Sequence, residues 1–160
     1  MFDRIVARID IVERALISLC FALMLLFALA QIVARNLFDY GFIWVDDAIK
    51  VLVLWVAMLG ALYATKKAKH ITIDVASRFL PRSAAKWLRR ILFLLTAAIC
   101  FIAAYYSWQF VLLEIEDPLI AFLNVPTWVC ELIIPASLLG MAIRFVGLAF
   151  SVSANAEEQP

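Results

Sequence analysis

Two long stretches of this chain contain no charged residue, and their length limits how the chain can fold. They cover residues 15–34 and 91–113 and are 20 and 23 residues long. A helix rises about 1.5 Å per residue and the hydrocarbon core of a bilayer is about 30 Å thick, so each stretch can cross a membrane once. The whole chain of 160 residues is 66% hydrophobic. We therefore predict an integral membrane protein.

Two further segments also fit a crossing, the second less cleanly than the first. The first begins at Trp44 and has no charge between residues 51 and 65. The second contains Glu131 and Arg144, but both lie within about two turns of an end, where long side chains can reach the interface. We predict an all-α membrane domain over residues 1–150 and a polar cytoplasmic tail over residues 151–160. The four transmembrane helices are expected at about 15–35, 44–66, 88–113 and 127–150.

The basic residues are distributed unevenly, and this predicts the orientation. Twelve of the 14 Lys and Arg residues lie in the N-terminal segment, in the connection between the second and third helices, or toward the C-terminal end. Only Arg35 and Lys50 lie on the other side. Because basic residues are enriched in cytoplasmic loops, we expect both termini and the middle connection in the cytoplasm, an N-in and C-in topology.

Two segments outside the crossings have the spacing of amphipathic helices. Residues 1–14 mix charged and apolar residues, so we expect this segment to lie along the inner surface before the chain turns into the membrane. In the middle connection, Ile71, Val75 and Phe79 predict a short cytoplasmic surface helix. The basic residues beside it would contact membrane lipids, either as a general anchor or as a site for a specific anionic lipid.

Residues suited to catalysis or cofactor binding are sparse. His70 is the only histidine, and the three cysteines have no CxxC spacing. The acidic stretch of Glu114, Glu116 and Asp117 fits a solvated loop better than a cation site, because no other oxygen-rich motif accompanies it. We predict no catalytic, cofactor or metal site and no enzyme activity. The net charge of +1 gives no reason to expect a nucleic-acid partner.

Polar residues at the expected helix ends predict local pairs. Asp46 and Asp47 begin the second helix, where the helix dipole favours carboxylates, and Lys50 follows at the spacing at which side chains meet. Arg35 should lie at the same depth, so we expect an outer ion pair with Asp46 or Asp47. Gln31 is expected to form a hydrogen bond to a neighbouring helix.

Proline and small residues predict the shape and contacts of the later helices. Pro135 falls inside the last crossing and should bend it, since its ring displaces the carbonyl of the preceding turn. Gly60 with Ala64, and Ala136 with Gly140, are pairs of small residues four apart. Such pairs allow close contact between membrane helices.

A set of residues in the second helix, the connection after it and the region of the last helix forms a recognisable pattern. The residues are Trp44, Asp47, Lys50, Trp55, Gly60, Ala61, His70, Ile71, Asp74, Pro126, Thr127, Trp128 and Pro135. They resemble the signature of the small membrane (Q) subunits of tripartite ATP-independent periplasmic (TRAP) transporters, which is roughly W-x-E-E-L-x-R, then W, G-A and H-I-x-V-D. Asp47 stands where Glu is usual and Lys50 where Arg is usual, so a carboxylate and a cation are both kept.

The resemblance implies a multi-pass protein of the bacterial inner membrane that scaffolds a large permease (M) subunit. In such a transporter the M subunit carries the substrate and sodium sites, and a periplasmic binding protein (P) delivers a small organic acid. Candidate assembly residues are Trp44, Asp47, Lys50, Trp55, Gly60, Ala64, His70, Asp74, Trp128 and Pro135.

The residues leave a second interpretation open. A self-contained chain of this size could be a homo-oligomeric channel or exporter, or the membrane anchor of an electron-transfer complex. Neighbouring genes for a large permease and a secreted binding protein would favour the transporter subunit.

Overall fold

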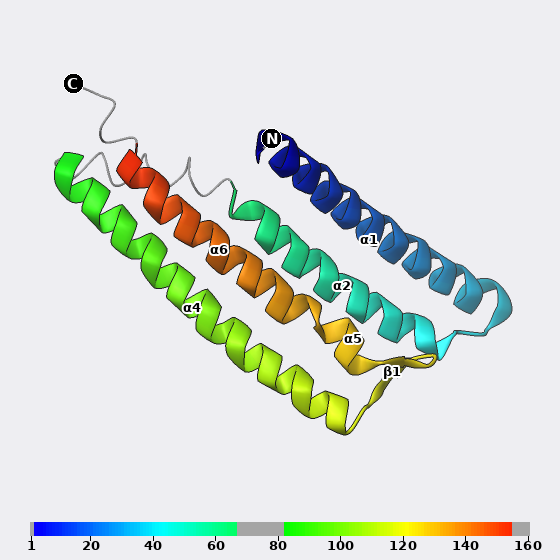
Figure 1. Ribbon diagram of the computed structural model, residues 1–160. Helices are drawn as coiled ribbons and strands as arrows, with labels where there is room; N and C mark the ends of the chain where they lie inside the picture. The colour runs from blue at the N-terminus through cyan, green and yellow to red at the C-terminus, as the bar shows by residue number, and fades with distance from the viewer. Residues whose placement is uncertain (1, 67–81, 155–160) are drawn as a thin grey trace. The chain divides into compact units, whose positions relative to one another are not determined.

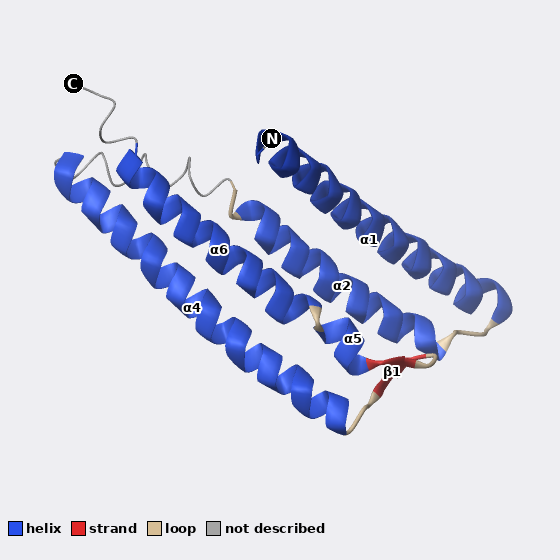
Figure 2. Cartoon of the chain, in the orientation of Figure 1, coloured by secondary structure: helices blue, strands red, loops and turns tan. Residues whose placement is uncertain are grey.

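The computed structural model describes residues 2–66 and 82–154, and most of these are helical (Figures 1 and 2). The elements in chain order are α1 (Phe2–Phe38), α2 (Ile43–Ala64), α4 (Arg82–Glu116), β1 (Ile120–Phe122), β2 (Val125–Pro126), α5 (Thr127–Glu131) and α6 (Ile133–Ala154). The surface helix expected in the middle connection lies outside the described residues. So do His70, Asp74 and the end of the C-terminal tail.

Three stretches of the described helices are long and apolar enough to cross a membrane. They are Asp10–Phe38 in α1, Lys86–Glu116 in α4 and Thr127–Ser151 in α5 and α6. This confirms helices of membrane-spanning length at three of the four expected positions. The helix α2 lies at the remaining position, but it carries Asp46, Asp47 and Lys50 near its start and is not among the three.

The helix α1 is continuous, so the expected turn between a surface segment and the first crossing is wrong. It runs from Phe2 to Phe38 without interruption. Its 37 residues include neither proline nor glycine, the residues that most readily break or bend a helix. The amphipathic spacing of the first residues therefore belongs to the same helix as the crossing.

A short antiparallel hairpin follows α4 and corrects the all-α prediction. Strands β1 and β2 form a two-stranded sheet, with Ile120 opposite Pro126 and Phe122 opposite Val125. The two strands are only three and two residues long. The hairpin is a local feature of the connection, and the chain remains predominantly helical.

The residues around the hairpin explain why α4 does not continue. Pro118 lacks the backbone N–H that a longer helix would need. Leu123, in the turn, has a φ of 49°, a left-handed conformation that few residues other than glycine and asparagine adopt. The Thr127 N–H donates to the Leu119 carbonyl at 2.9 Å, which closes the hairpin where α5 begins.

The last crossing is interrupted at Leu132, close to the bend expected from Pro135. Helix α5 ends at Glu131 and α6 begins at Ile133. Pro135 has no N–H to donate to the carbonyl of Glu131, and its ring crowds that carbonyl. The break therefore lies one turn before the proline itself.

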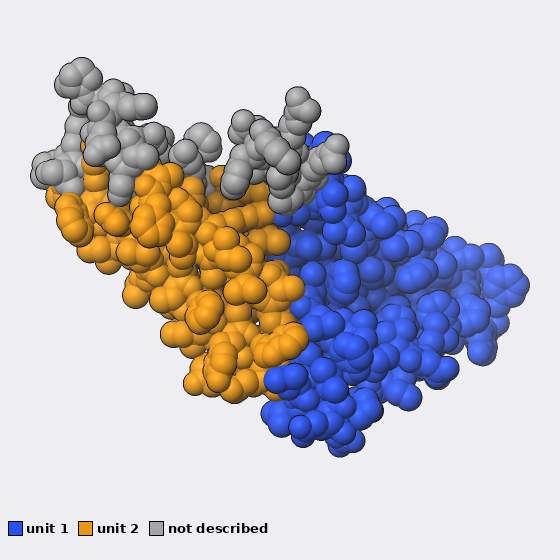
Figure 3. All heavy atoms as spheres, in the orientation of Figure 1, with its two compact units in different colours: residues 1–60, 110–133 blue, residues 61–109, 134–160 orange. Residues whose placement is uncertain are grey.

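The chain forms two compact units (Figure 3). Unit 1 comprises residues 1–60 and 110–133, and unit 2 comprises residues 61–109 and 134–160. In unit 1, Val111 is 1% exposed and forms part of the buried interior. In unit 2, Phe93 and Ala149 are buried and pack with partly buried apolar residues of α6. Each unit therefore has an apolar interior of its own.

Candidate functional site

A polar cluster joins the end of α1 to the start of α2 in unit 1. Gln31 is buried, donates from Nε2 to the Phe42 carbonyl at 3.0 Å and accepts from the Phe42 N–H at 3.2 Å. Its Nε2 also lies 3.3 Å from Asp46 Oδ1, and Arg35 Nη2 lies 2.7 Å from Asp46 Oδ2. The Gln31 cluster, as we name it, consists of Gln31, Arg35, Gly41, Phe42 and Asp46.

Gly41 belongs to this cluster because a side chain there would press against Arg35. A Cβ at Gly41 would lie 2.8 Å from Arg35 Nε and 3.4 Å from Gln31 Nε2. Nearby, Asp39 has a φ of 49°, which aspartate tolerates better than most residues. Since buried polar groups cost free energy unless they are hydrogen-bonded, the cluster fixes how the chain passes from α1 to α2.

The two adjacent aspartates have different partners. Asp46 pairs with Arg35, whereas Asp47 accepts from Lys50 Nζ at 2.8 Å. The four side chains are between 40% and 76% exposed, and exposed ion pairs contribute little in water. Of the two pairings that the sequence offered for Arg35, the structure therefore shows the one with Asp46.

Two of the candidate tryptophans are held by groups of the chain itself. The Trp44 ring packs on Phe27 and Phe42, with centroids 6.0 and 6.3 Å away. Trp55 in α2 donates from its indole Nε1 to the carbonyl of Cys130 in α5 at 3.0 Å. That carbonyl comes two residues before the helix interruption. The bond therefore ties α2 to the part of the last crossing where the backbone is irregular.

Trp128 and Pro135 come before and after this interruption in the chain. Trp128 is half-buried in α5, and its carbonyl accepts the N–H of Leu132 at 3.1 Å. Pro135 is buried in α6. Both residues are thus part of the helix irregularity that the sequence predicted only as a bend.

The C-terminal end of α2 lies in unit 2. It is capped by groups whose contact with α2 was not predicted from the sequence. The Leu62 carbonyl accepts hydrogen bonds from the Arg144 guanidinium and from the Thr65 hydroxyl. The last carbonyls of a helix lack partners within it and carry partial negative charge, so a cation there is favourable. Gly140 permits a close approach, because an added Cβ would lie 3.0 Å from Leu62 Cδ1. Burial, together with the charge of Arg144, lowers the pKa of Lys66 from its ordinary value.

Gly60 and Ala64 are in more open surroundings. A Cβ added at Gly60 would meet no atom within 4 Å, and Ala64 is exposed. Four residues apart on α2, they share one face of this helix. The neighbouring Ala57 is also exposed. We name Ala57, Gly60 and Ala64 the small-residue face of α2.

The described residues contain no cluster of metal-ligating side chains. Within residues 2–66 and 82–154, no three His, Cys, Asp or Glu side chains are placed to hold a metal ion. Cys20 and Cys130 are buried and Cys100 is partly buried, and all three are free thiols. Sequence reasoning missed Gly41 and Arg144, although a glycine in a short connection and an arginine inside an apolar helix are the signals that mark them.

These features define a class of protein: a helical membrane protein whose described polar contacts join its own helices. Residues 14–154 match the family model described as tripartite ATP-independent periplasmic transporters, DctQ component. The chain therefore belongs to this family, and it is an inner-membrane protein that functions in transport.

Two relatives illustrate the similarity. The chain is 28% identical over 99 residues to the C4-dicarboxylate TRAP transporter small permease protein DctQ of Vibrio cholerae, an alignment covering 62% of this chain and 41% of that protein. It is 29% identical over 79 residues to the sialic acid TRAP transporter permease protein SiaT of Haemophilus influenzae, covering 49% of this chain and 13% of SiaT. The alignments thus span less than half the length of each relative.

Proposed function

We propose that this chain is the small (Q) subunit that scaffolds the large (M) permease subunit of a TRAP transporter. The transporter would take up a small organic acid, delivered by a periplasmic binding protein, in symport with sodium. The observation that carries this proposal is the family match over residues 14–154. The segment similar to this chain occupies only 13% of SiaT, which supports a role beside a larger permease part. The names of both relatives refer to organic acids, which supports the substrate class.

The exposed face of α4 supports a scaffold. Leu95, Ile99, Ile102 and Tyr106 recur at helical spacing, and each is more than half exposed. A stripe of this kind in a membrane contacts lipid or another helix. Apart from the Tyr106 hydroxyl, it supplies no group that could replace the water around an anion or a sodium ion, which a carrier needs near the midplane.

The positions of the charged residues agree with this interpretation. In each of the three stretches of membrane-spanning length, every charged residue lies within about two turns of an end. We propose that α2 forms the fourth crossing, with Asp46, Asp47 and Lys50 at the outer interface. Both termini would then be cytoplasmic. This topology is supported by the twelve-to-two distribution of basic residues.

The test is uptake into liposomes under an inward sodium gradient. Four samples are compared for uptake of labelled C4-dicarboxylates and sialic acid. They are the chain alone, the chain with the M subunit, the chain with both M subunit and binding protein, and the M subunit and binding protein without the chain. We expect uptake only when all three proteins are present. Protein-free liposomes and a gradient of potassium in place of sodium are the controls.

Each possible result bears on a different part of the proposal. Substrate-specific uptake by the chain alone would contradict the scaffold role. Equal uptake by the M subunit and binding protein without this chain would contradict a requirement for it. Equal uptake with sodium and potassium would contradict sodium coupling and leave the scaffold role intact.

A further inference from the structure

Unit 2 has an apolar groove between α4 and α6. Its volume is about 440 Å³, within the range of small-molecule sites. The floor includes Ala97 and Ala142, which are both 4% exposed, and the walls include Phe101 and Ile143, which are 59% and 65% exposed. Because the side chains on the floor are small and those on the walls are large, the groove is open to the surroundings. The remaining lining residues are Leu94, Ala98, Leu139 and Val146.

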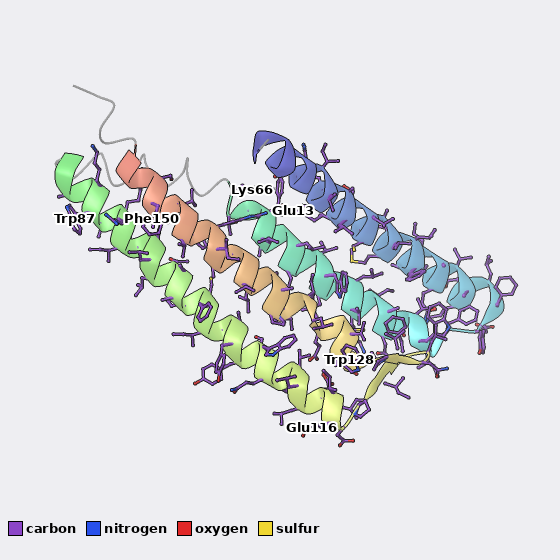
Figure 4. The ribbon with its side chains drawn as sticks, viewed as in Figure 1. Glu13, Lys66, Trp87, Glu116, Trp128 and Phe150 are labelled. Atoms are coloured by element: carbon purple, nitrogen blue, oxygen red, sulfur yellow. The ribbon has the colours of Figure 1, made fainter. Side chains whose placement is uncertain are left out.

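Basic residues lie directly beyond one end of this groove. Arg90 comes one turn before Leu94 on α4, and Phe150 comes one turn after Val146 on α6. The Arg90 guanidinium lies over the Phe150 ring, 5.9 Å from its centroid. Figure 4 shows Trp87 and Phe150 at this end of α4 and α6. The groove therefore ends at a cation that the neighbouring helix holds in place.

The charge around this end is of one sign. Lys86 is exposed one turn before Arg90, and Arg89 is half-buried beside it. Among the described residues of unit 2, no aspartate or glutamate is present to neutralise them. The exposed Trp87 suits the interfacial level of a membrane. An anionic group at the lipid headgroup level would therefore find several cations among the described residues at this end.

The groove and the basic residues beyond it together span about one leaflet of a bilayer. On α4 the lining runs from Leu94 to Phe101, which is about 10 Å at 1.5 Å per residue. From Arg90, one turn earlier, to Phe101 the distance is roughly 16 Å, about half of the 30 Å hydrocarbon core. A transmembrane helix of a partner would need a contact surface through both leaflets. A lipid acyl chain needs only one leaflet.

We propose that the groove between α4 and α6 holds an acyl chain of an anionic phospholipid whose phosphate lies against Arg90 and Lys86. The acyl chain would fill the groove over Ala97 and Ala142. Without a bound acyl chain, the groove would be filled only by loosely packed bulk lipid. The phosphate would accept hydrogen bonds from the Arg90 guanidinium, whose planar fork suits phosphate oxygens. The site is distinct from any role of the chain in moving substrate.

Native mass spectrometry of the purified full-length chain in detergent tests this directly. The protein is titrated with dioleoyl phosphatidylglycerol or with dioleoyl phosphatidylcholine, which have the same acyl chains but different headgroups. We expect one lipid per chain to be retained, with the anionic lipid bound about fivefold more tightly, as expected for one cation at the membrane surface. Equal affinity for the two lipids would overturn the proposal.

Two variants separate the headgroup contact from the acyl groove. Arg90→Gln should lower the preference for phosphatidylglycerol, and Arg14→Gln, which deletes an exposed arginine on α1, should leave it unchanged. Ala98→Phe, at an exposed lining position, should lower retention of both lipids. Ile99→Phe, at the next exposed position outside the lining, should not.

The remaining outcomes are also decisive. Helix content and thermal unfolding identify any variant that fails to fold, and Ala98→Leu then serves as a milder groove variant. Unchanged lipid retention in a folded groove variant would overturn the proposal. Loss of the co-purified M subunit together with unchanged lipid retention would show that the groove binds protein instead.

Discussion

At the scale of single residues, Gln31 shows how one amide orders a connection that has no regular secondary structure. Both backbone groups of Phe42 pair with the Gln31 side chain, and Asp46 takes a further contact from it. An exposed ion pair is worth less than about 1 kcal/mol, whereas a buried polar group left without a partner costs about 1–3 kcal/mol. The amide, more than the Arg35–Asp46 pair, therefore stabilises this corner.

This ranking can be tested by substitution. We expect Gln31→Leu to lower the free energy of unfolding by about 1–3 kcal/mol, because it leaves the N–H of Phe42 without its partner, whereas the Phe42 carbonyl still accepts from the Val45 N–H. Arg35→Gln should cost less than about 1 kcal/mol. Thermal unfolding in one detergent, followed by circular dichroism, measures both. Gln109→Leu, at an exposed position of α4, is the matched control, and an equal loss in the control would refute the ranking.

Gly41 gives a second prediction at this scale. A methyl group there would approach Arg35 Nε to 2.8 Å, so Gly41→Ala should displace the arginine and separate it from Asp46. We expect a loss of up to about 1 kcal/mol in the free energy of unfolding. Gly147→Ala, inside α6 with no atom within 4 Å, should instead stabilise by about 0.5–1 kcal/mol. If Gly41→Ala also stabilised the protein, Arg35 would be able to move away from residue 41 without loss of stability, and the prediction would be wrong.

At the scale of elements, the sequence was sufficient for the long helices and insufficient for the details at their ends. Charge-free runs of 20 and 23 residues predict helices of membrane-spanning length, and this prediction does not depend on which other helices pack against them. The hairpin of β1 and β2 was missed because its strands are only three and two residues long. Such short strands have no periodicity of their own.

The candidate site was partly predictable for a similar reason. Pairs within one helix, such as Asp47 and Lys50, follow from spacing alone. The choice of Asp46 for Arg35, and the contact of Arg144 with the end of α2, depend on how separate helices pack. Spacing along the chain carries no information about that packing.

The bond from Trp55 to the Cys130 carbonyl supports a prediction about these elements. In a variant with Cys20 and Cys100 replaced by alanine, Trp55→Phe keeps a ring in place and deletes the donor. We expect the buried Cys130 thiol to react with a maleimide up to about fivefold faster, since a hydrogen bond contributes about 1 kcal/mol. Trp108→Phe, at an exposed position, should leave the rate unchanged. An unchanged rate for Trp55→Phe would show that the bond does not hold α5.

At the scale of the whole molecule, the proposed orientation predicts the outcome of cysteine labelling. In a chain otherwise free of cysteine, Ser83→Cys should resist a membrane-impermeant maleimide added to intact cells, and Leu119→Cys should react. Leu119 is 64% exposed beside the hairpin, so burial would not protect it. Permeabilised cells should label both positions. The opposite pattern in intact cells would reverse the topology.

The scaffold role makes its sharpest prediction at the small-residue face of α2. Gly60→Leu and Ala64→Leu add bulk where the structure offers open or exposed space, so the isolated chain should keep its thermal stability. Close approach of a partner helix needs small residues, and overpacking costs about 1–3 kcal/mol, which weakens association by about five- to a hundredfold. The amount of M subunit that co-purifies with the tagged chain should fall accordingly, together with uptake.

Two measurements test whether weaker association with the M subunit explains any loss of uptake. Ala22→Leu adds the same bulk at an exposed position of α1 and should leave co-purification unchanged. The affinity of the binding protein for its substrate should also stay the same, because that protein meets its substrate before either membrane subunit is involved. If Gly60→Leu lowers uptake while the complex stays intact, then α2 acts in the transport step itself and the chain is more than a scaffold.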